Sequence, residues 1–172
     1  MLANGVDFPN PEAERFRHDT TRLWHNEGRG RFAEAAAAVG MDDDGDGRGV
    51  VIFDYDDDGD QDVLIAQHEG RALLYRNEGG SARGYLRVRL IGREGNRDAL
   101  GARVRVRRRA GEPWLLRESI GGSQFLGQSE SILHFGLGAY GGPVAELEVR
   151  WPDGETTRLR DVESRRMVEI RE

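Results

Sequence analysis

The sequence predicts a mainly β protein, in which partial propeller blades built as an antiparallel meander are followed by a small antiparallel β-sandwich. Three observations predict this fold class. Short runs rich in β-branched residues are separated by Gly and Asp turns, as in a meander. A six-residue pattern recurs after 51 residues, a spacing typical of propeller repeats. From Tyr85 onward, apolar residues and Arg alternate with a period of two, which is typical of half-buried strands.

The composition excludes several classes of function. The 172 residues include no Cys, which excludes disulfides, thiolate metal sites and cysteine nucleophiles. No apolar run approaches the roughly 20 residues of a membrane helix, and residues 1–10 lack the basic-then-apolar order of a secretory signal. The net charge of −6 is unevenly divided: residues 1–80 carry 8 Arg and 18 acids (−10), and residues 81–172 carry 17 Arg and 13 acids (+4). The opposite net charges of the two halves indicate two modules with different surfaces.

The first module, residues 1–80, is predicted to be a blade segment. Short apolar runs predict its strands at 49–54, 62–66 and 72–76. Residues 35–38 are all Ala and predict a short turn of helix after a strand end. The recurring pattern is an apolar–aromatic pair followed by a basic residue, Asn, Glu and Gly, and it stands at Leu23–Gly28 and Leu74–Gly79.

The second module is predicted to be the sandwich, residues 85–172, after a polar and Gly-rich boundary at 79–84. Along 102–107, apolar residues alternate with Arg, so we expect the valines to face inward and the arginines outward. The expected strands are 85–91, 102–107, 114–120, 132–137, 145–151, 156–159 and 167–171. Trp-Pro-Asp-Gly-Glu at 151–155 predicts a hairpin turn. Many short strands in so short a segment are typical of a small sandwich.

The strongest local signal is an acidic loop, residues 54–62, with the sequence Asp-Tyr-Asp-Asp-Asp-Gly-Asp-Gln-Asp. Like charges about 4 Å apart repel by about 1 kcal/mol even in water. Ca²⁺ relieves this repulsion because it takes roughly six to eight oxygen ligands. The predicted ligands occupy alternating positions: Asp54, Asp56, Asp58, Asp60 and Asp62. Asp60 is expected to contribute its backbone carbonyl, and Asp57 and Gln61 to point outward.

Other interpretations of the acidic segments remain open. The first six positions of the loop also match an EF-hand, but the twelfth is Ile65 rather than Glu and the flanks are predicted strands. A solvated acidic turn without an ion is the second alternative. Upstream, Asp42, Asp44 and Asp46 have the same spacing, but Val50 at the ninth position cannot ligate through its side chain. An exposed turn is favoured there, with a second ion as the alternative.

The sequence resembles two known families. The segments 47–50, 54–60 and 74–77 resemble an FG-GAP or VCBS-type propeller repeat. The segments 95–104, 121–123, 133–138 and 149–154 resemble the ASPIC/UnbV domain. Together they look like the C-terminal part of a cartilage-acidic-protein-like chain. The resemblance implies calcium-binding blades, a β-rich C-terminal domain and an extracellular or periplasmic location. A propeller needs at least four blades, so we expect this chain to be a piece of a longer propeller or to pair bare strand edges with another chain.

The predicted function is a calcium-binding, non-catalytic interaction or ligand-binding module. Its candidate partners are a protein or a carbohydrate, and self-association through exposed blade edges is a further expectation. The alternative, suggested by bacterial relatives beside enediyne biosynthesis genes, is an accessory enzyme or binding protein of secondary metabolism. The polar groups that such an enzyme could use are Ser119, Ser123, Gln124, Gln128, Ser129, Glu130 and His134.

Catalysis has little support in the sequence pattern. A Gly-x-Ser-x-Gly nucleophile elbow is absent. His134 alternates with apolar neighbours on a predicted strand, which favours a surface or hydrogen-bonded structural role. Glu118 and Glu130 are a candidate acid–base pair, but no pattern fixes their separation. The remaining histidines lack the paired spacing of a zinc site: His18, His25 and His68.

Two further stretches have a functional and a structural interpretation. The arginines of 103–109 form a basic strip, but no aromatic residues interleave with it to stack bases and the whole chain is acidic, so no nucleic-acid partner is expected. The segment Gly121–Ser129 could bind a polyol through its amides, but a tight loop between strands is the favoured interpretation.

Overall fold

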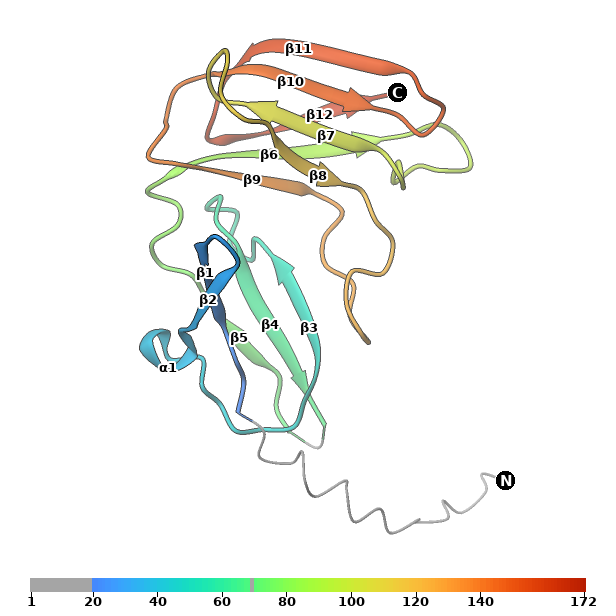
Figure 1. Cartoon of the computed structure of the whole chain (residues 1–172). Helices are drawn as coiled ribbons and strands as arrows, with labels where there is room; N and C mark the ends of the chain where they lie inside the picture. Colours follow the sequence, from blue (N-terminus) through green and yellow to red (C-terminus); the bar gives the residue numbers. More distant parts are fainter. Residues whose placement is uncertain (1–19, 69) are drawn as a thin grey trace, which may run out of the picture. The chain divides into compact units, whose positions relative to one another are not determined.

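The computed structural model describes residues 20–68 and 70–172. They form twelve strands and one short helix (Figure 1). Residues 2–5, which resemble the end of a blade strand, lie outside the described residues, as do the rest of the N-terminal segment 1–10 and His18. The chain divides into two compact units, which are described separately: Met1–Gly49 with Ile65–Leu73, and Val50–Leu64 with Leu74–Glu172. No described helix has both the length and the apolar character needed to cross a membrane.

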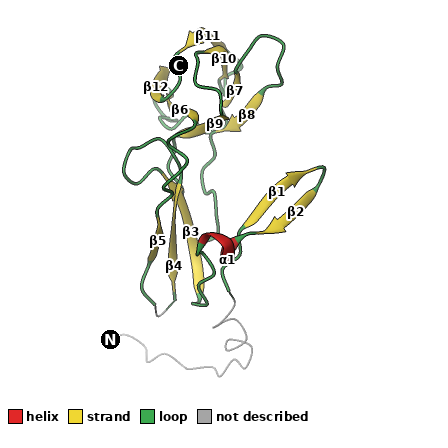
Figure 2. Cartoon of the chain, turned by 90° about the vertical axis from the view of Figure 1, so that its left-hand side faces the viewer, coloured by secondary structure: helices red, strands yellow, loops and turns green. Residues whose placement is uncertain are grey.

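The first unit contains a hairpin and the helix (Figure 2). Strand β1 (Trp24–Gly28) pairs with β2 (Arg31–Glu34) in antiparallel register. Helix α1 (Ala36–Val39) follows and ends at Gly40, whose left-handed backbone (φ 73°) allows the chain to turn. The predicted short helical turn after a strand end is confirmed.

A three-stranded sheet is formed by the strands on either side of the acidic loop and the next strand along the chain. Its order is β3-β4-β5, with bounds β3 Gly47–Phe53, β4 Asp62–Gln67 and β5 Leu73–Tyr75. All three predicted strands are therefore found. The acidic loop joins β3 to β4, which run in opposite directions (Figure 1). None of the four sheets in the described residues is closed, and this one has fewer strands than the four of a propeller blade.

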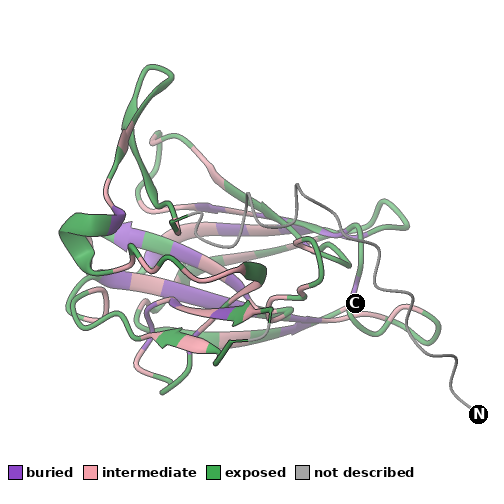
Figure 3. Ribbon diagram, turned by 90° about the horizontal axis from the view of Figure 1, so that it is seen from below, coloured by how far each residue is buried: buried purple, intermediate pink, exposed green. Residues whose placement is uncertain are grey.

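The second unit is built around two sheets that share one hydrophobic core. One sheet has the order β11-β10-β7-β8, with bounds β7 Arg103–Arg107, β8 Leu115–Glu118, β10 Val144–Arg150 and β11 Thr156–Val162. The other has the order β12-β6-β9, with bounds β6 Gly84–Ile91, β9 Leu133–Gly138 and β12 Arg166–Arg171. Buried residues are purple in the ribbon of Figure 3. Both sheets contribute fully buried side chains to the core: Leu86, Val88, Val104, Val106, Phe135, Leu137, Leu147 and Val149.

The turn predicted at 151–155 joins β10 to β11. Trp151 N donates to Glu155 O at 2.9 Å, and the indole Nε1 donates to Thr157 Oγ1 at 2.9 Å. The expectation of a wholly antiparallel sandwich is wrong at one strand pair, because β12 runs parallel to β6. The chain reaches β12 from β11, in the other sheet, and enters beside β6 in the same direction. A period of two in the sequence marks a strand but carries no information on its direction.

The alternation of apolar residues and Arg is confirmed on β7, where Val104 and Val106 are fully buried and the arginines face away from the core. Strand β6 differs. Leu86 and Val88 are buried in the core as expected, but Arg87 between them is also buried, with 6% of its surface exposed. Another part of the chain must therefore cover the outer face of β6.

Ion pairs across strands occupy the outer face of the β10 sheet. Glu148 lies opposite both Arg105 on β7 and Arg158 on β11, at 2.8 Å from each. The hydrogen bond from Arg105 is the largest influence that lowers the pKa of Glu148 below its ordinary 4.5, and burial works against it. The lowered pKa makes the folded state favour the ionised carboxylate.

This carboxylate gives a pH prediction. Because its folded-state pKa is depressed, its contribution to stability is present above about pH 4.5 and is lost as the pH falls through the folded pKa. We expect Glu148→Gln to lower the free energy of unfolding by about 1 kcal/mol at neutral pH, a modest value because both arginines are partly exposed. The difference from wild type should shrink as the pH falls below 4.5 and through the lowered folded-state pKa. The exposed Glu163→Gln is the control, and a pH-independent Glu148→Gln deficit in urea titrations would contradict the assignment.

Candidate metal centre

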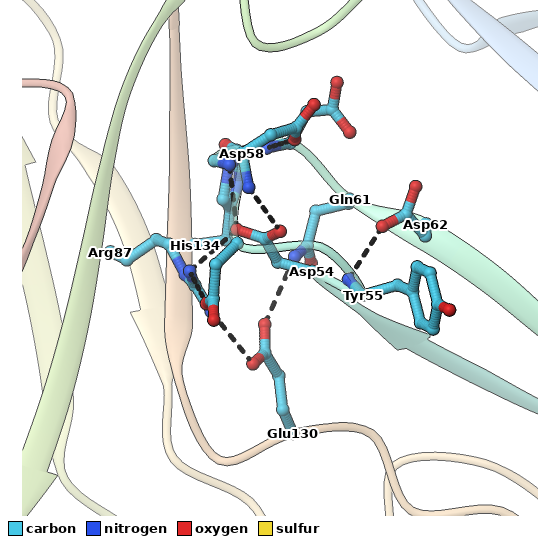
Figure 4. Close-up of polar contacts among 11 residues, drawn as sticks. Asp54, Tyr55, Asp58, Gln61, Asp62, Arg87, Glu130 and His134 are labelled. Carbon is cyan, nitrogen blue, oxygen red and sulfur yellow. Dashed lines mark hydrogen bonds and ion pairs between the residues drawn. The ribbon is translucent and has the colours of Figure 1, made fainter. Parts of the chain in front are cut away.

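The acidic loop belongs to the same compact unit as the two C-terminal sheets. It packs on the outer face of strands β6 and β9, where Tyr85, Arg87 and His134 meet it. His134 Nε2 lies 3.0 Å from Gly59 O, and Arg87 is paired across the strands with His134 (Figure 4). This contact explains why Arg87 is buried although the alternation of its strand predicts an outward side chain.

Gly59 allows the loop to approach the sheet closely. A Cβ built at this position would lie 2.0 Å from the Tyr85 ring, and φ is +97°, a conformation that L side chains rarely adopt. The glycine at the sixth position of the loop is therefore required both by the turn and by the contact with β6.

Asp54 is the centre of the hydrogen-bond network of the loop. Its side chain is fully buried. Its Oδ1 accepts from Asp58 N at 3.1 Å, its Oδ2 accepts from Gly59 N at 2.9 Å, and its Oδ2 lies 2.7 Å from Arg87 Nη1 (Figure 4). The Asp54 carboxylate thus closes the turn of the acidic loop and forms an ion pair with Arg87 on β6.

Two other acids connect the loop to the segment after β5. Asp62 accepts from Tyr55 N at 2.8 Å and from Asn77 N at 2.7 Å, so both of its oxygens bind backbone. Asp60 Oδ2 accepts from Ser81 N at 2.9 Å, whereas its Oδ1 is buried without a hydrogen-bond partner. Burial, followed by the nearby carboxylates, raises the pKa of Asp60 above its ordinary 3.8.

Three of the five predicted ligands come together. Among residues 20–68 and 70–172, Asp54, Asp56 and Asp58 form the one group of at least three acidic or His side chains with ligand atoms within 4.8 Å of one another. Oxygens on opposite sides of a Ca²⁺ ion, each about 2.4 Å from it, are about 4.8 Å apart. The three carboxylates therefore fit one such ion. The side chains of Asp60 and Asp62 are outside this group.

The residues expected to point outward do so only in part. The Asp57 side chain is 87% exposed, yet its Oδ1 lies 3.0 Å from Arg87 Nη1. Gln61 Nε2 donates to Glu130 Oε1 at 3.3 Å, and Glu130 Oε2 lies 3.4 Å from Arg87 Nη2. Burial lowers the pKa of Arg87, but its carboxylate partners outweigh burial and hold that pKa above the ordinary value, so the guanidinium stays charged.

The sequence analysis did not identify the residues outside the acidic loop that contact its carboxylates. Arg76 Nε lies 3.2 Å from Asp56 Oδ2, and Asn77 donates to Asp62. Both belong to the recurring pattern, which was noted as a repeat but not as a part of the site. The two copies also share a local turn, since Asn26 and Asn77 each accept through Oδ1 from the backbone N–H two residues later. Arg87 had no sequence signal beyond strand alternation, which placed it correctly on the side away from the core but did not indicate that the acidic loop covers that side.

The upstream acidic segment is organised differently. Asp43 Oδ1 accepts from Gly45 N at 2.9 Å and from Gln67 Nε2, and Asp46 lies 2.7 Å from Arg48. The described residues include no group of three carboxylates there that meets the same 4.8 Å criterion.

The candidate catalytic groups have structural partners. Ser119 Oγ is buried and donates to Asp98 O at 2.8 Å. Within Gly121–Ser129, Ser123 Oγ donates to Gln124 and accepts from Ser129 N. Hydrogen bonds between its own residues therefore hold this loop, as expected for a tight loop between strands. It also covers part of the β3 edge, because Ile52 N donates to Ser129 Oγ at 3.0 Å.

The arginine strip also differs from its expected environment in one respect. No aromatic residue stands among residues 103–109, but the centroid of the Trp114 ring lies 4.5 Å from the guanidinium carbon of Arg105 and 4.1 Å from that of Arg107. Sequence reasoning missed this contact because Trp114 precedes the neighbouring strand. The five arginines nevertheless pair with glutamates: Arg103 with Glu118, Arg105 with Glu148, Arg107 with Glu146, and Arg108 and Arg109 with Glu112.

Comparison with known proteins concerns the second half of the chain. No curated protein matches the sequence. Residues 92–172 match the protein-family model described as ASPIC and UnbV. This segment covers strands β7 to β12, while β6 and the acidic loop precede it. This match supports an ASPIC/UnbV domain in the C-terminal part of the chain, residues 92–172.

Proposed function

We propose that this chain is a calcium-binding, non-catalytic interaction module in which one Ca²⁺ ion bound by the acidic loop stabilises the contact between that loop and the β6–β9 face. The observation that carries the proposal is the group of Asp54, Asp56 and Asp58 oxygens within 4.8 Å of one another. The donor set consists of carboxylates, which suit hard cations.

Two further features of the loop support a cation. Six loop carboxylates and Glu130 meet two guanidinium groups, those of Arg76 and Arg87, so negative charge remains in excess. Asp60 Oδ1 is buried without a partner, and an uncompensated buried carboxylate oxygen is costly. With calcium bound, Asp54, Asp56 and Asp58 would hold the ion. The candidates for further ligands are Asp62 and Asp60, the latter through its carbonyl or through Oδ1.

The wider setting belongs to the same proposal. The repeated Asn turn and the Asp loop between two strands favour an FG-GAP or VCBS-type repeat that continues in a longer propeller. An extracellular or periplasmic location fits calcium sites of extracellular modules, which bind with a Kd of roughly 10⁻⁴–10⁻³ M. The partner would be a protein or a carbohydrate that meets the β-sandwich or an open strand edge.

A thermal melt with calcium and with chelator tests the ion. At ten times the Kd, binding stabilises the folded state by about 1.4 kcal/mol, so we expect calcium to raise the wild-type Tm by about 3–6 °C. Asp58→Ala removes one member of the carboxylate group and should show almost no calcium effect.

Glu163→Gln is the control. It removes one negative charge at an exposed position between β11 and β12, outside the acidic loop. It should keep the calcium effect of the wild type. Identical wild-type melts with calcium and with chelator, together with no heat of calcium binding in titration calorimetry, would overturn the proposal.

A further inference from the structure

We infer that Arg87 is a built-in counter-ion of the acidic loop, which keeps the loop folded without calcium and thereby lowers both the calcium affinity and the stabilisation that calcium adds. The inference rests on the proposed calcium site. It assigns a role to a residue of β6, outside the acidic loop and before the segment that matches the ASPIC/UnbV domain.

The geometry is that of a cation enclosed by carboxylates. The Arg87 side chain is 7% exposed, and its Nη1 lies 2.7 Å from Asp54 Oδ2 and 3.0 Å from Asp57 Oδ1. Asp54 is fully buried and is also a member of the carboxylate group. The guanidinium and a metal ion would therefore be held by the same carboxylate.

Shared use of one carboxylate makes the two cations compete. Each reduces the negative potential that attracts the other, and the attraction between charges a few ångströms apart in a partly buried site is strong. A coupling of this kind is reciprocal: whatever Arg87 removes from calcium affinity, calcium removes from the stabilising effect of Arg87.

Glu130 allows Arg87 to remain buried when calcium is bound. Its Oε2 lies 3.4 Å from Arg87 Nη2, and its Oε1 accepts from Gln61 at the same time. A buried guanidinium that lost all of its partners would be strongly destabilising. With Glu130 and Asp57 on either side, the charge of Asp54 can be drawn toward a metal while Arg87 keeps two carboxylates.

The test compares Arg87→Met with Arg89→Met in the full chain, with chelator and with saturating calcium. Arg89 is two residues along β6 and is exposed, so it controls for the loss of one positive charge from the strand. For Arg87→Met we expect a Tm loss of about 10 °C in chelator and of about 6 °C in calcium, so that the calcium-dependent increment about doubles. Calorimetry should show calcium binding on the order of tenfold tighter. Arg89→Met should leave both quantities at the wild-type values.

The outcomes separate the two proposals. A wild type that neither binds nor responds to calcium refutes the calcium site itself. A wild type that responds, with an Arg87→Met increment equal to or smaller than its own, refutes the counter-ion role and leaves the site in place.

Arg87→Lys decides the matter if Arg87→Met does not fold in either condition. Lys retains the charge and loses the planar fork of donors. A calcium increment equal to that of the wild type supports charge compensation. An increment that is enlarged although the charge is retained contradicts it.

Discussion

Asp54→Asn should be the most destabilising single-charge change in the acidic loop, with a loss of about 3 kcal/mol in the free energy of unfolding. The substitution keeps the size of the side chain but replaces a charged acceptor with an amide. It leaves Arg87 short of its nearest carboxylate, 2.7 Å away, in a site where the Asp54 side chain has no exposed surface. It also weakens the hydrogen bonds from Asp58 N and Gly59 N that close the turn.

Asp57→Asn is the matched control, since the same substitution at an 87% exposed position that also contacts Arg87 should cost less than about 1 kcal/mol. Urea titration in chelator measures both variants without any contribution from calcium. Equal losses at the two positions would show that the burial of Asp54 against β6 does not contribute as the structure indicates.

Phe135→Ala should cost about 3–5 kcal/mol, enough to bring the sandwich close to unfolding at 25 °C. Phe135 lies on β9 and is the largest fully buried side chain in the described residues. Phe135 is part of the core shared by the two sheets. Because the side chains of a core are closely packed, its neighbours in the two sheets cannot move far enough to fill the cavity. Because β9 also carries His134, which contacts the acidic loop, loss of this core should weaken the loop contact too.

Phe125→Ala provides the comparison for the same substitution at an exposed site. Phe125 lies in the loop between β8 and β9, with 78% of its surface exposed, and its removal should change the free energy of unfolding by no more than about 0.5 kcal/mol. A large loss at Phe125 would mean that its ring is covered in solution, for example by a second copy of the chain. A small loss at Phe135 would mean that the two sheets do not form one core.

The contact of the acidic loop with β6 and β9 would connect the calcium site to the sandwich. The acidic loop packs on the outer face of β6 and β9, whose inner face forms part of the core. Calcium bound at the loop would therefore stabilise the sandwich as well as the turn between β3 and β4. A partner that binds the sandwich would respond to calcium without touching the ion.

Local sequence patterns were sufficient to predict ten of the twelve strands in the described residues, and missed the hairpin of β1 and β2. Each of the ten predicted strands is present, from β3 to β12, because a period of two in hydrophobicity and a turn rich in Gly, Asp or Pro are properties of short segments. The grouping of Asp54, Asp56 and Asp58 is local for the same reason: alternate residues around a glycine turn lie close together whatever the rest of the chain does. The short helix after β2 is another prediction of this kind.

Contacts between distant segments were not predictable in this way. The parallel pairing of β12 with β6 joins residues about 80 positions apart, and strand periodicity does not encode direction. The stacking of Trp114 on Arg105 and Arg107 likewise depends on how β8 lies beside β7.

The sequence by itself determined where ten of the twelve described strands lie, that acidic side chains gather in one turn, and which family the last 81 residues match. Only the tertiary structure decided that this turn packs on β6, and so that an arginine with the spacing of a solvent-facing residue is enclosed by Asp54, Asp57 and Glu130. Alternation along a strand tells which side faces the core. Burial of the opposite side depends on a segment from elsewhere in the chain. Here that segment is the acidic loop, whose Asp57 lies 30 residues before Arg87 in the sequence and has the opposite charge.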